Sequence, residues 1–199
     1  MDKLKKHYLF LFIIVIVGII IGIIFSNILN VDDEKLVYTK LTTYFNNLKN
    51  DIPINYMSNL ITTLKNNLIT IIVIWLLGLS IIGLLFNNFI LFFKGFILGF
   101  TVGSIINIYL YSGIIISIVY IFPATLFNTF LFLITTYYAN IFSLKIFNII
   151  FRKKEYKFGL LIKKYSKILG VFTIILIISS IYETFITPFF IKLFSFIIK

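Results

Sequence analysis

The sequence predicts an all-α membrane protein, a polytopic bundle of about five transmembrane helices with the N-terminus inside and the C-terminus outside. The composition of the 199 residues supports this class, because 60% of them are hydrophobic and only 13% are charged. Soluble domains are about half apolar and about a quarter charged. The mean hydropathy is +1.07. Since a bilayer span needs about 20 apolar residues, the chain has room for about four to six spans.

The first predicted span covers residues 8–29 and follows three lysines at the start of the chain. Its end lacks the small-residue cleavage site of a signal peptide, so we expect the span to be retained. Residues 30–67 are polar and balanced in charge, with apolar residues at helical spacing. This pattern predicts one or two short amphipathic helices at the membrane surface, in the only sizeable region outside the spans.

Four further spans follow, each bounded by polar or basic residues, at residues 68–86, 95–111, 114–142 and 168–185. The third and fourth are separated by a turn at Ser112-Gly113. The fourth is longer than a straight crossing requires and contains Pro123, which predicts a kink or break near residues 119–122. Residues 145–167 form a basic loop, with eight basic residues against one acid, a net charge of +7.

The orientation follows from the distribution of basic residues, which are enriched on the cytoplasmic side of membrane proteins. With the N-terminus inside, three N-terminal lysines, Lys94 and the eight basic residues of 145–167 are cytoplasmic, which is twelve of the 18. The opposite orientation places the basic loop outside. The sequence therefore predicts a cytoplasmic loop at 145–167 and an exterior segment at 30–67.

Small residues recur at intervals of four on the first and third spans, at Gly18, Gly22 and Ser26 and at Gly95, Gly99 and Gly103. Residues four apart share a helix face, and small residues let two membrane helices approach closely. Packing within the bundle and a homo-oligomer interface both use this pattern. The first is the interpretation that we favour.

Glu183 is the only acid within the apolar spans. A carboxylate at this depth needs a partner or a wet cavity, so either a structural ion pair or a role in partner binding or transport is open. The sequence offers four candidate partners: Lys35, Lys65, Tyr182 and Thr187. The fourth span is unusually polar, and interhelical hydrogen bonding is the commoner use of such residues, although a transporter uses them as ligands. They are Thr125, Asn128, Thr129, Thr135, Thr136 and Asn140.

Several classes of chemistry lack their residues. The chain has no cysteine and a single histidine, His7, and it shows no paired carboxylates, catalytic triad or nucleotide-binding glycine loop. We therefore expect no enzyme, cofactor or metal, and no nucleic-acid partner despite the net charge of +11. Arg152, Lys153 and Lys154 are interpreted as a topology signal that contacts anionic membrane lipids, with docking of a cytoplasmic partner as the alternative.

Two stretches resemble a known family. Residues 74–83, IWLLGLSIIG, and 93–103, FKGFILGFTVG, resemble the second and third spans of the stage II sporulation protein M family of endospore-forming Firmicutes. Residues 181–188, IYETFITP, are similar to its Glu-x-x-x-Thr-Pro ending. The resemblance covers nearly the whole chain, and the fourth span departs from it.

The resemblance implies a multi-pass protein of the septal and engulfing membrane of the mother cell. Members of the family act without catalysis and help to place the stage II D and P proteins, which degrade peptidoglycan. We expect such a scaffold to use residues 30–67 and the outer end of the last span as its contact surface. The alternative is a transporter or channel subunit for a small solute or ion, which Glu183 and the broken fourth span favour.

Overall fold

The computed structural model describes residues 2–50, 55–121, 124–153 and 157–193, and in these ranges it is built of helices. Their order along the chain is α1 (Asp2–Ser26), α2 (Val31–Lys49), α3 (Tyr56–Gly78), α4 (Gly83–Ile121), α5 (Thr125–Arg152) and α6 (Phe158–Leu193). All but α2 are long and apolar enough to cross a membrane. The prediction of an all-α bundle with five spans is therefore confirmed.

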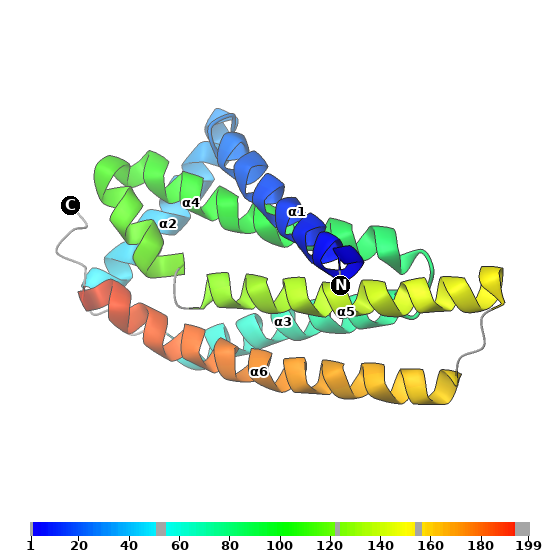
Figure 1. The fold of residues 1–199 in the computed structure, drawn as a ribbon. Coiled ribbons are helices and arrows are strands. Elements are labelled where there is room, and N and C mark those ends of the chain that lie inside the picture. The colour runs from blue at the N-terminus through cyan, green and yellow to red at the C-terminus, as the bar shows by residue number, and fades with distance from the viewer. Residues whose placement is uncertain (1, 51–54, 122–123, 154–156, 194–199) are drawn as a thin grey trace.

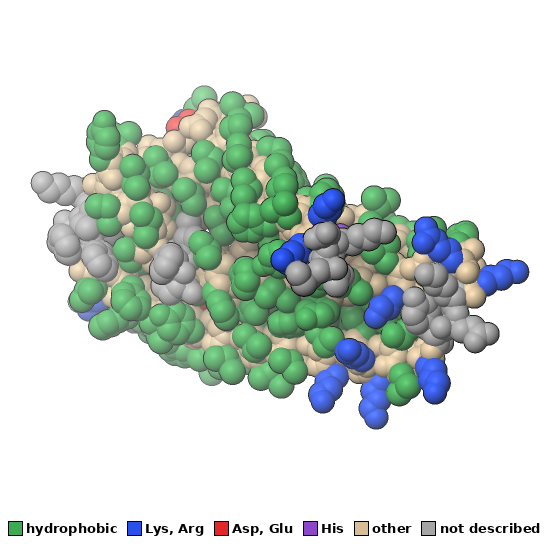
Figure 2. Space-filling model, in the orientation of Figure 1, with side chains coloured by type: hydrophobic (Ala, Val, Ile, Leu, Met, Phe, Trp, Pro, Cys, Tyr) green, Lys and Arg blue, Asp and Glu red, His purple; other side chains and the backbone are tan. Residues whose placement is uncertain are grey.

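The five long helices alternate in direction along one axis of the bundle (Figure 1). The starts of α1, α4 and α6 lie toward one end, where α3 and α5 finish. The starts of α3 and α5 lie at the other end, together with α2 and the finish of α6. Segments far apart in the sequence thus meet at each end. We call the end that holds α2 the α2 end, and the other the basic end, because Lys and Arg side chains gather there (Figure 2).

The helices reach beyond the predicted spans. α3 begins at Tyr56, so the second half of the predicted surface segment is continuous with the second crossing, and α3 ends at Gly78. The predicted loop at 145–167 is mostly helical, because α5 continues to Arg152 and α6 begins at Phe158. α6 has 36 residues and is about 54 Å long, which exceeds a hydrocarbon core of about 30 Å. Its basic first turns therefore project from the lipid as helix.

α4 starts at Gly83, earlier than the predicted third span, and reverses sharply near its end. Leu110 has φ 50° and ψ −126°, a backbone conformation that separates the crossing from a short returning piece ending at Ile121. Gly113 permits the reversal, since a Cβ there would lie 2.6 Å from the carbonyl oxygen of Ile105. The predicted fourth span therefore does not form one helix: residues 114–121 belong to the returning piece, and the next crossing begins at Thr125. Pro123 lies outside the described residues.

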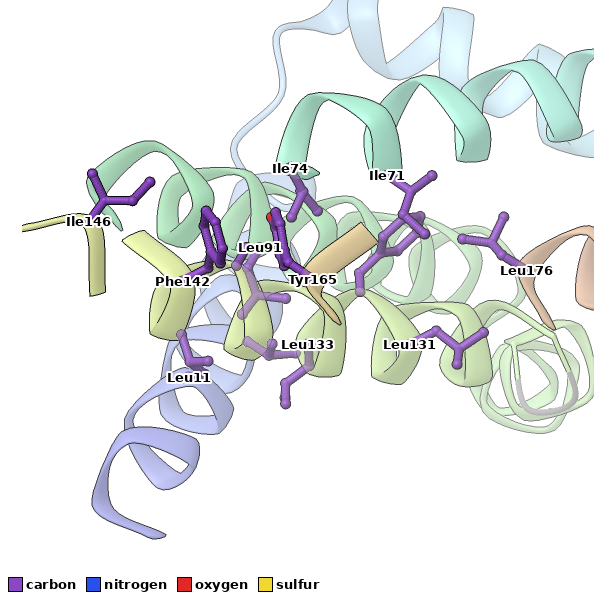
Figure 3. Close-up of a cluster of buried hydrophobic side chains, with 13 residues drawn as sticks. Leu11, Ile71, Ile74, Leu91, Leu131, Leu133, Phe142, Ile146, Tyr165 and Leu176 are labelled. Atoms are coloured by element: carbon purple, nitrogen blue, oxygen red, sulfur yellow. The ribbon is translucent and has the colours of Figure 1, made fainter. Parts of the chain in front are cut away.

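Buried side chains from all five crossing helices form a central core (Figure 3). At its centre the rings of Phe142 and Tyr165 stack, with centroids 4.3 Å apart, and the Tyr165 hydroxyl donates to the carbonyl oxygen of Trp75 at 3.2 Å. A smaller cluster closes the α2 end, where α2 packs on α4 and α6. Its buried members are Phe45, Leu48, Ile105, Ile116 and Ile191.

Candidate functional site

Glu183 on α6 is held by a polar side chain from α5. The Asn128 side-chain amide donates to the Glu183 carboxylate at 2.9 Å. Asn128 lies near the start of α5 and is buried. The hydrogen-bond partner of Glu183 is thus Asn128, one of the polar residues of the predicted fourth span. None of the four candidates expected from the sequence occupies that position.

Lys94 on α4 brings a positive charge to the same region. Its ammonium nitrogen lies 4.6 Å from the ring centroid of Phe132 on α5, a distance at which cation and ring attract each other. Lys94 and Glu183 also interact electrostatically, although they are not in direct salt-bridge contact. Three crossing helices are therefore joined by one acid, one base and one amide, which we call the charged triad: Lys94, Asn128 and Glu183.

A cavity of about 200 Å³ opens beside the triad at the α2 end. α3 contributes Asn59, Thr62 and Thr63, and α6 contributes Glu183 and Thr187. Tyr44, Thr125, Thr184 and Pro188 complete the lining. Hydroxyl groups, an amide and a carboxylate therefore converge where four separate helices meet, and the cavity has the hydrogen-bonding chemistry to hold a polar or positively charged group.

Thr187 and Pro188 are the last residues of the Glu-x-x-x-Thr-Pro stretch, and both line this cavity. The Thr187 hydroxyl is buried and has no hydrogen-bond partner within the described part of the chain. Pro188 continues α6 without a backbone N–H, which removes one helical hydrogen bond at this point. Buried polar groups are normally paired, so this end of α6 has capacity for an added hydrogen bond.

The six small residues predicted to pack helices all lie at one contact, between α1 and α4. A Cβ at Gly18 or Gly22 would strike the backbone of Phe92 or Phe96 on α4, and a Cβ at Gly95 would lie 2.5 Å from the carbonyl oxygen of Val15. Gly99 faces the carbonyl of Ile19, and Gly103 faces the hydroxyl of Ser26. The two helices run in parallel with matched steps of four residues. The ladder is therefore occupied within one chain.

Arg152 and Lys153, from the predicted topology signal, are exposed at the finish of α5, and Lys153 ends the helix in a left-handed conformation with φ 47°. Lys154 lies outside the described residues. Most of the Lys and Arg side chains visible in Figure 2 gather at this end of the bundle. The acids Asp32, Asp33 and Glu34 start α2 at the opposite end, where a helix N-terminus favours negative charge.

Two further hydrogen bonds join crossing helices: the one from Asn140 is of the kind expected for the polar fourth span, whereas the one from Asn67 was not predicted. Asn67 on α3 donates to the Ser180 hydroxyl on α6 at 3.0 Å, and Asn140 on α5 donates to Asn88 on α4 at 2.7 Å. The threonines of the fourth stretch behave differently, since Thr129 and Thr135 donate to carbonyls of their own helix. The signal for Asn67 was its helical spacing to the residues of the second span. It was missed because the predicted span began at residue 68, one residue after Asn67.

No group of three or more His, Cys, Asp or Glu that would hold a metal ion occurs among the described residues. In a comparison with known protein families, the family model for stage II sporulation protein M matches residues 11–188. Neither the curated proteins nor the solved structures yield a match to this chain. The matched range includes at least part of every helix that crosses the bundle, and all of the cavity-lining stretch from Glu183 to Pro188 on α6.

Proposed function

The chain belongs to the stage II sporulation protein M family, and on that premise we propose that it is a non-catalytic scaffold of the engulfment machinery. It is a sporulation-related membrane protein with five helices that are able to span the bilayer. In the proposed role it anchors peptidoglycan hydrolases, the stage II D and P proteins, at the septal and engulfing membrane of the mother cell. In this role the protein determines where the hydrolases act and catalyses no reaction itself.

The observation that carries the proposal furthest is the polar cavity at the α2 end. Most of the Lys and Arg side chains visible in Figure 2 lie at the other end, and the positive-inside rule assigns that end to the cytoplasm. The cavity and α2 then face the exterior, on the side where cell-wall enzymes work. A cavity lined by Glu183, Thr187 and the start of α3 offers a partner hydrogen-bond acceptors and donors at the membrane surface.

The test is to fill the cavity without disturbing the bundle. Thr62 is exposed and lines the cavity, so Thr62→Arg places a long cationic side chain in it. We expect the variant to insert at normal levels while fluorescently tagged hydrolases no longer gather at the septal membrane and engulfment stops. Thr43→Arg is the matched control, because Thr43 is exposed on α2 and does not line the cavity.

Two results would contradict the proposal, one for the contact surface and one for the scaffold role. Normal gathering of the hydrolases in Thr62→Arg cells would exclude the cavity as the contact surface. Complete engulfment in cells that lack the gene would remove the scaffold role itself. Expression and membrane insertion of each variant are measured by immunoblotting of the membrane fraction.

Transport of a small solute or ion is the second candidate, and the charged triad favours it. Charged residues inside membrane helices frequently mark solute or ion pathways. This function requires flux in proteoliposomes that falls in Glu183→Gln, whereas the scaffold role requires none. Absence of flux from wild-type protein would exclude it.

A further inference from the structure

A long groove runs between α1 and α5 near the basic end, with a volume of about 780 Å³. Its walls are aliphatic and aromatic, with Leu9 and Phe12 on α1 and Ile134 and Tyr137 on α5. Lys5 and Lys6, about one helical turn before Leu9, also line it, and Tyr8 and Tyr138 complete the lining. The groove thus has an apolar surface with a pair of positive charges at one end.

The groove faces outward from the bundle, as its exposed walls show. Leu9 is 57% and Phe12 is 45% exposed, although both belong to a crossing helix. In a membrane these side chains contact lipid. Lys5 and Lys6 are exposed as well, and no acidic side chain lines the groove among the residues whose side chains the structure describes. Its occupant must therefore combine an apolar body with a negative head.

We propose that this groove binds one anionic phospholipid. An acyl chain lies along Leu9, Phe12 and Ile134, and the phosphate group lies between the ammonium groups of Lys5 and Lys6. Basic pockets between membrane helices on the cytoplasmic side are suited to such headgroups. A zwitterionic lipid has the same acyl chains but brings a positive group near the lysines, so the groove discriminates by charge. A second apolar helix in the groove would leave the two lysines without counter-charges.

The first measurement is lipid binding to the full-length protein, purified in detergent. Native mass spectrometry counts bound phosphatidylglycerol and phosphatidylcholine of matched acyl length, and competition between them gives the selectivity. Each lysine near an anionic headgroup contributes about a fivefold preference, so two lysines predict a selectivity of about 25-fold. We expect the double variant Lys5→Gln/Lys6→Gln to lose most of this selectivity.

Two comparisons separate the groove from diffuse attraction. Lys153→Gln/Lys157→Gln removes the same charge from the basic end at exposed residues outside the groove, and we expect its selectivity to equal that of wild type. Leu9→Trp keeps both lysines but fills the groove, and we expect it to lower binding of both lipids. Thermal unfolding in detergent micelles shows whether each variant is folded.

Three outcomes would overturn the proposal. Equal loss of selectivity in Lys5→Gln/Lys6→Gln and in Lys153→Gln/Lys157→Gln means that net charge attracts the lipid. Full selectivity in Lys5→Gln/Lys6→Gln means that the headgroup binds elsewhere. Displacement of phosphatidylglycerol by millimolar glycerol phosphate means that the site holds a free anion and that the apolar groove contributes nothing.

Discussion

α4 makes two contacts of opposite character. Toward α1 it presents glycines, and the two backbones approach until carbonyl oxygens of α1 occupy the space that side chains of α4 would need. Toward α5 and α6 it presents Lys94, and these helices are linked by side chains that meet through charge and hydrogen bonds. The first contact is made mainly by backbone atoms. The second is polar and borders a cavity.

The difference shows how one helix serves two purposes in a bilayer. Lipid provides little apolar driving force for helix association, so close backbone packing has to fix the α1·α4 pair. Along the glycines such packing has a single register and leaves no space for a side chain. A polar contact contains groups that can bind an added partner, as the Thr187 hydroxyl illustrates, which has no hydrogen-bond partner among the described residues. We therefore assign rigidity to the glycine contact and binding to the polar one.

The largest effect is expected at the centre of the glycine contact. Gly99→Leu places a side chain against the carbonyl oxygen of Ile19, and a backbone oxygen cannot move aside without moving α1. We expect the free energy of unfolding to fall by about 3 kcal/mol, as overpacking of a closely packed site requires. Thermal unfolding in detergent measures this change. Limited proteolysis shows in addition whether α1 has come away from α4.

The control is a glycine of another crossing helix that touches nothing. A Cβ at Gly170 on α6 would meet no atom within 4 Å. Gly170→Leu should leave the unfolding free energy unchanged or raise it by up to about 1 kcal/mol, since leucine favours helix over glycine. Equal destabilisation by Gly99→Leu and Gly170→Leu would show that the α1·α4 contact has no special role.

An intermediate effect is expected at the charged triad. Lys94→Met leaves Glu183 with Asn128 as its remaining partner in the triad, and Glu183→Gln leaves Lys94 without its opposite charge. Each change should lower the unfolding free energy by about 2 kcal/mol, because an uncompensated charge in a membrane helix is costly. The double variant should be less destabilised than the sum of the two by about 1 kcal/mol or more, which a double-mutant cycle measures.

A second cycle pairs Glu183→Gln with Lys65→Met. Lys65 was a candidate partner in the sequence, yet it is exposed on α3 and its charge does not enter the triad. The two changes should therefore be additive within about 0.5 kcal/mol. Coupling of Glu183 to Lys65 rather than to Lys94 would reverse the assignment and restore the partner that the sequence suggested.

Much of the fold was predictable because hydropathy reports directly on lipid contact. It identified five crossings, but it marks where the chain leaves the lipid and not where a helix ends. Basic residues such as Lys163 lie on the projecting turns of α6, and these turns stay helical because each residue still bonds within its own helix. The reversal at Leu110 carried a weaker signal, since its turn was placed at Ser112-Gly113 and the hinge itself is an ordinary apolar residue.

The site was less predictable, because pairing between helices is not a property of local sequence. The isolated acid Glu183 signalled a buried polar contact, whereas Lys94 looked like a boundary between spans. In the structure α4 starts at Gly83, so Lys94 lies well inside the helix, where it can face Phe132 and Glu183. The glycine ladders were readable for the opposite reason: their spacing of four is set by the helix itself, so the sequence contains the whole pattern.

The smallest effect is expected at the α2 end of the glycine contact, where a side chain replaces backbone as the obstacle. A Cβ at Gly103 would meet the Ser26 hydroxyl, which donates to the carbonyl oxygen of Ile23 at 2.7 Å. A hydroxyl rotates away more easily than a carbonyl, so Gly103→Ala should lower the unfolding free energy by only about 1 kcal/mol. Ser26→Ala/Gly103→Ala should recover about half of that loss, because the Ser26 Cβ would still lie 3.1 Å from the new methyl group. No recovery in the double variant would place the obstacle in the backbone and make this end of the contact as rigid as its centre.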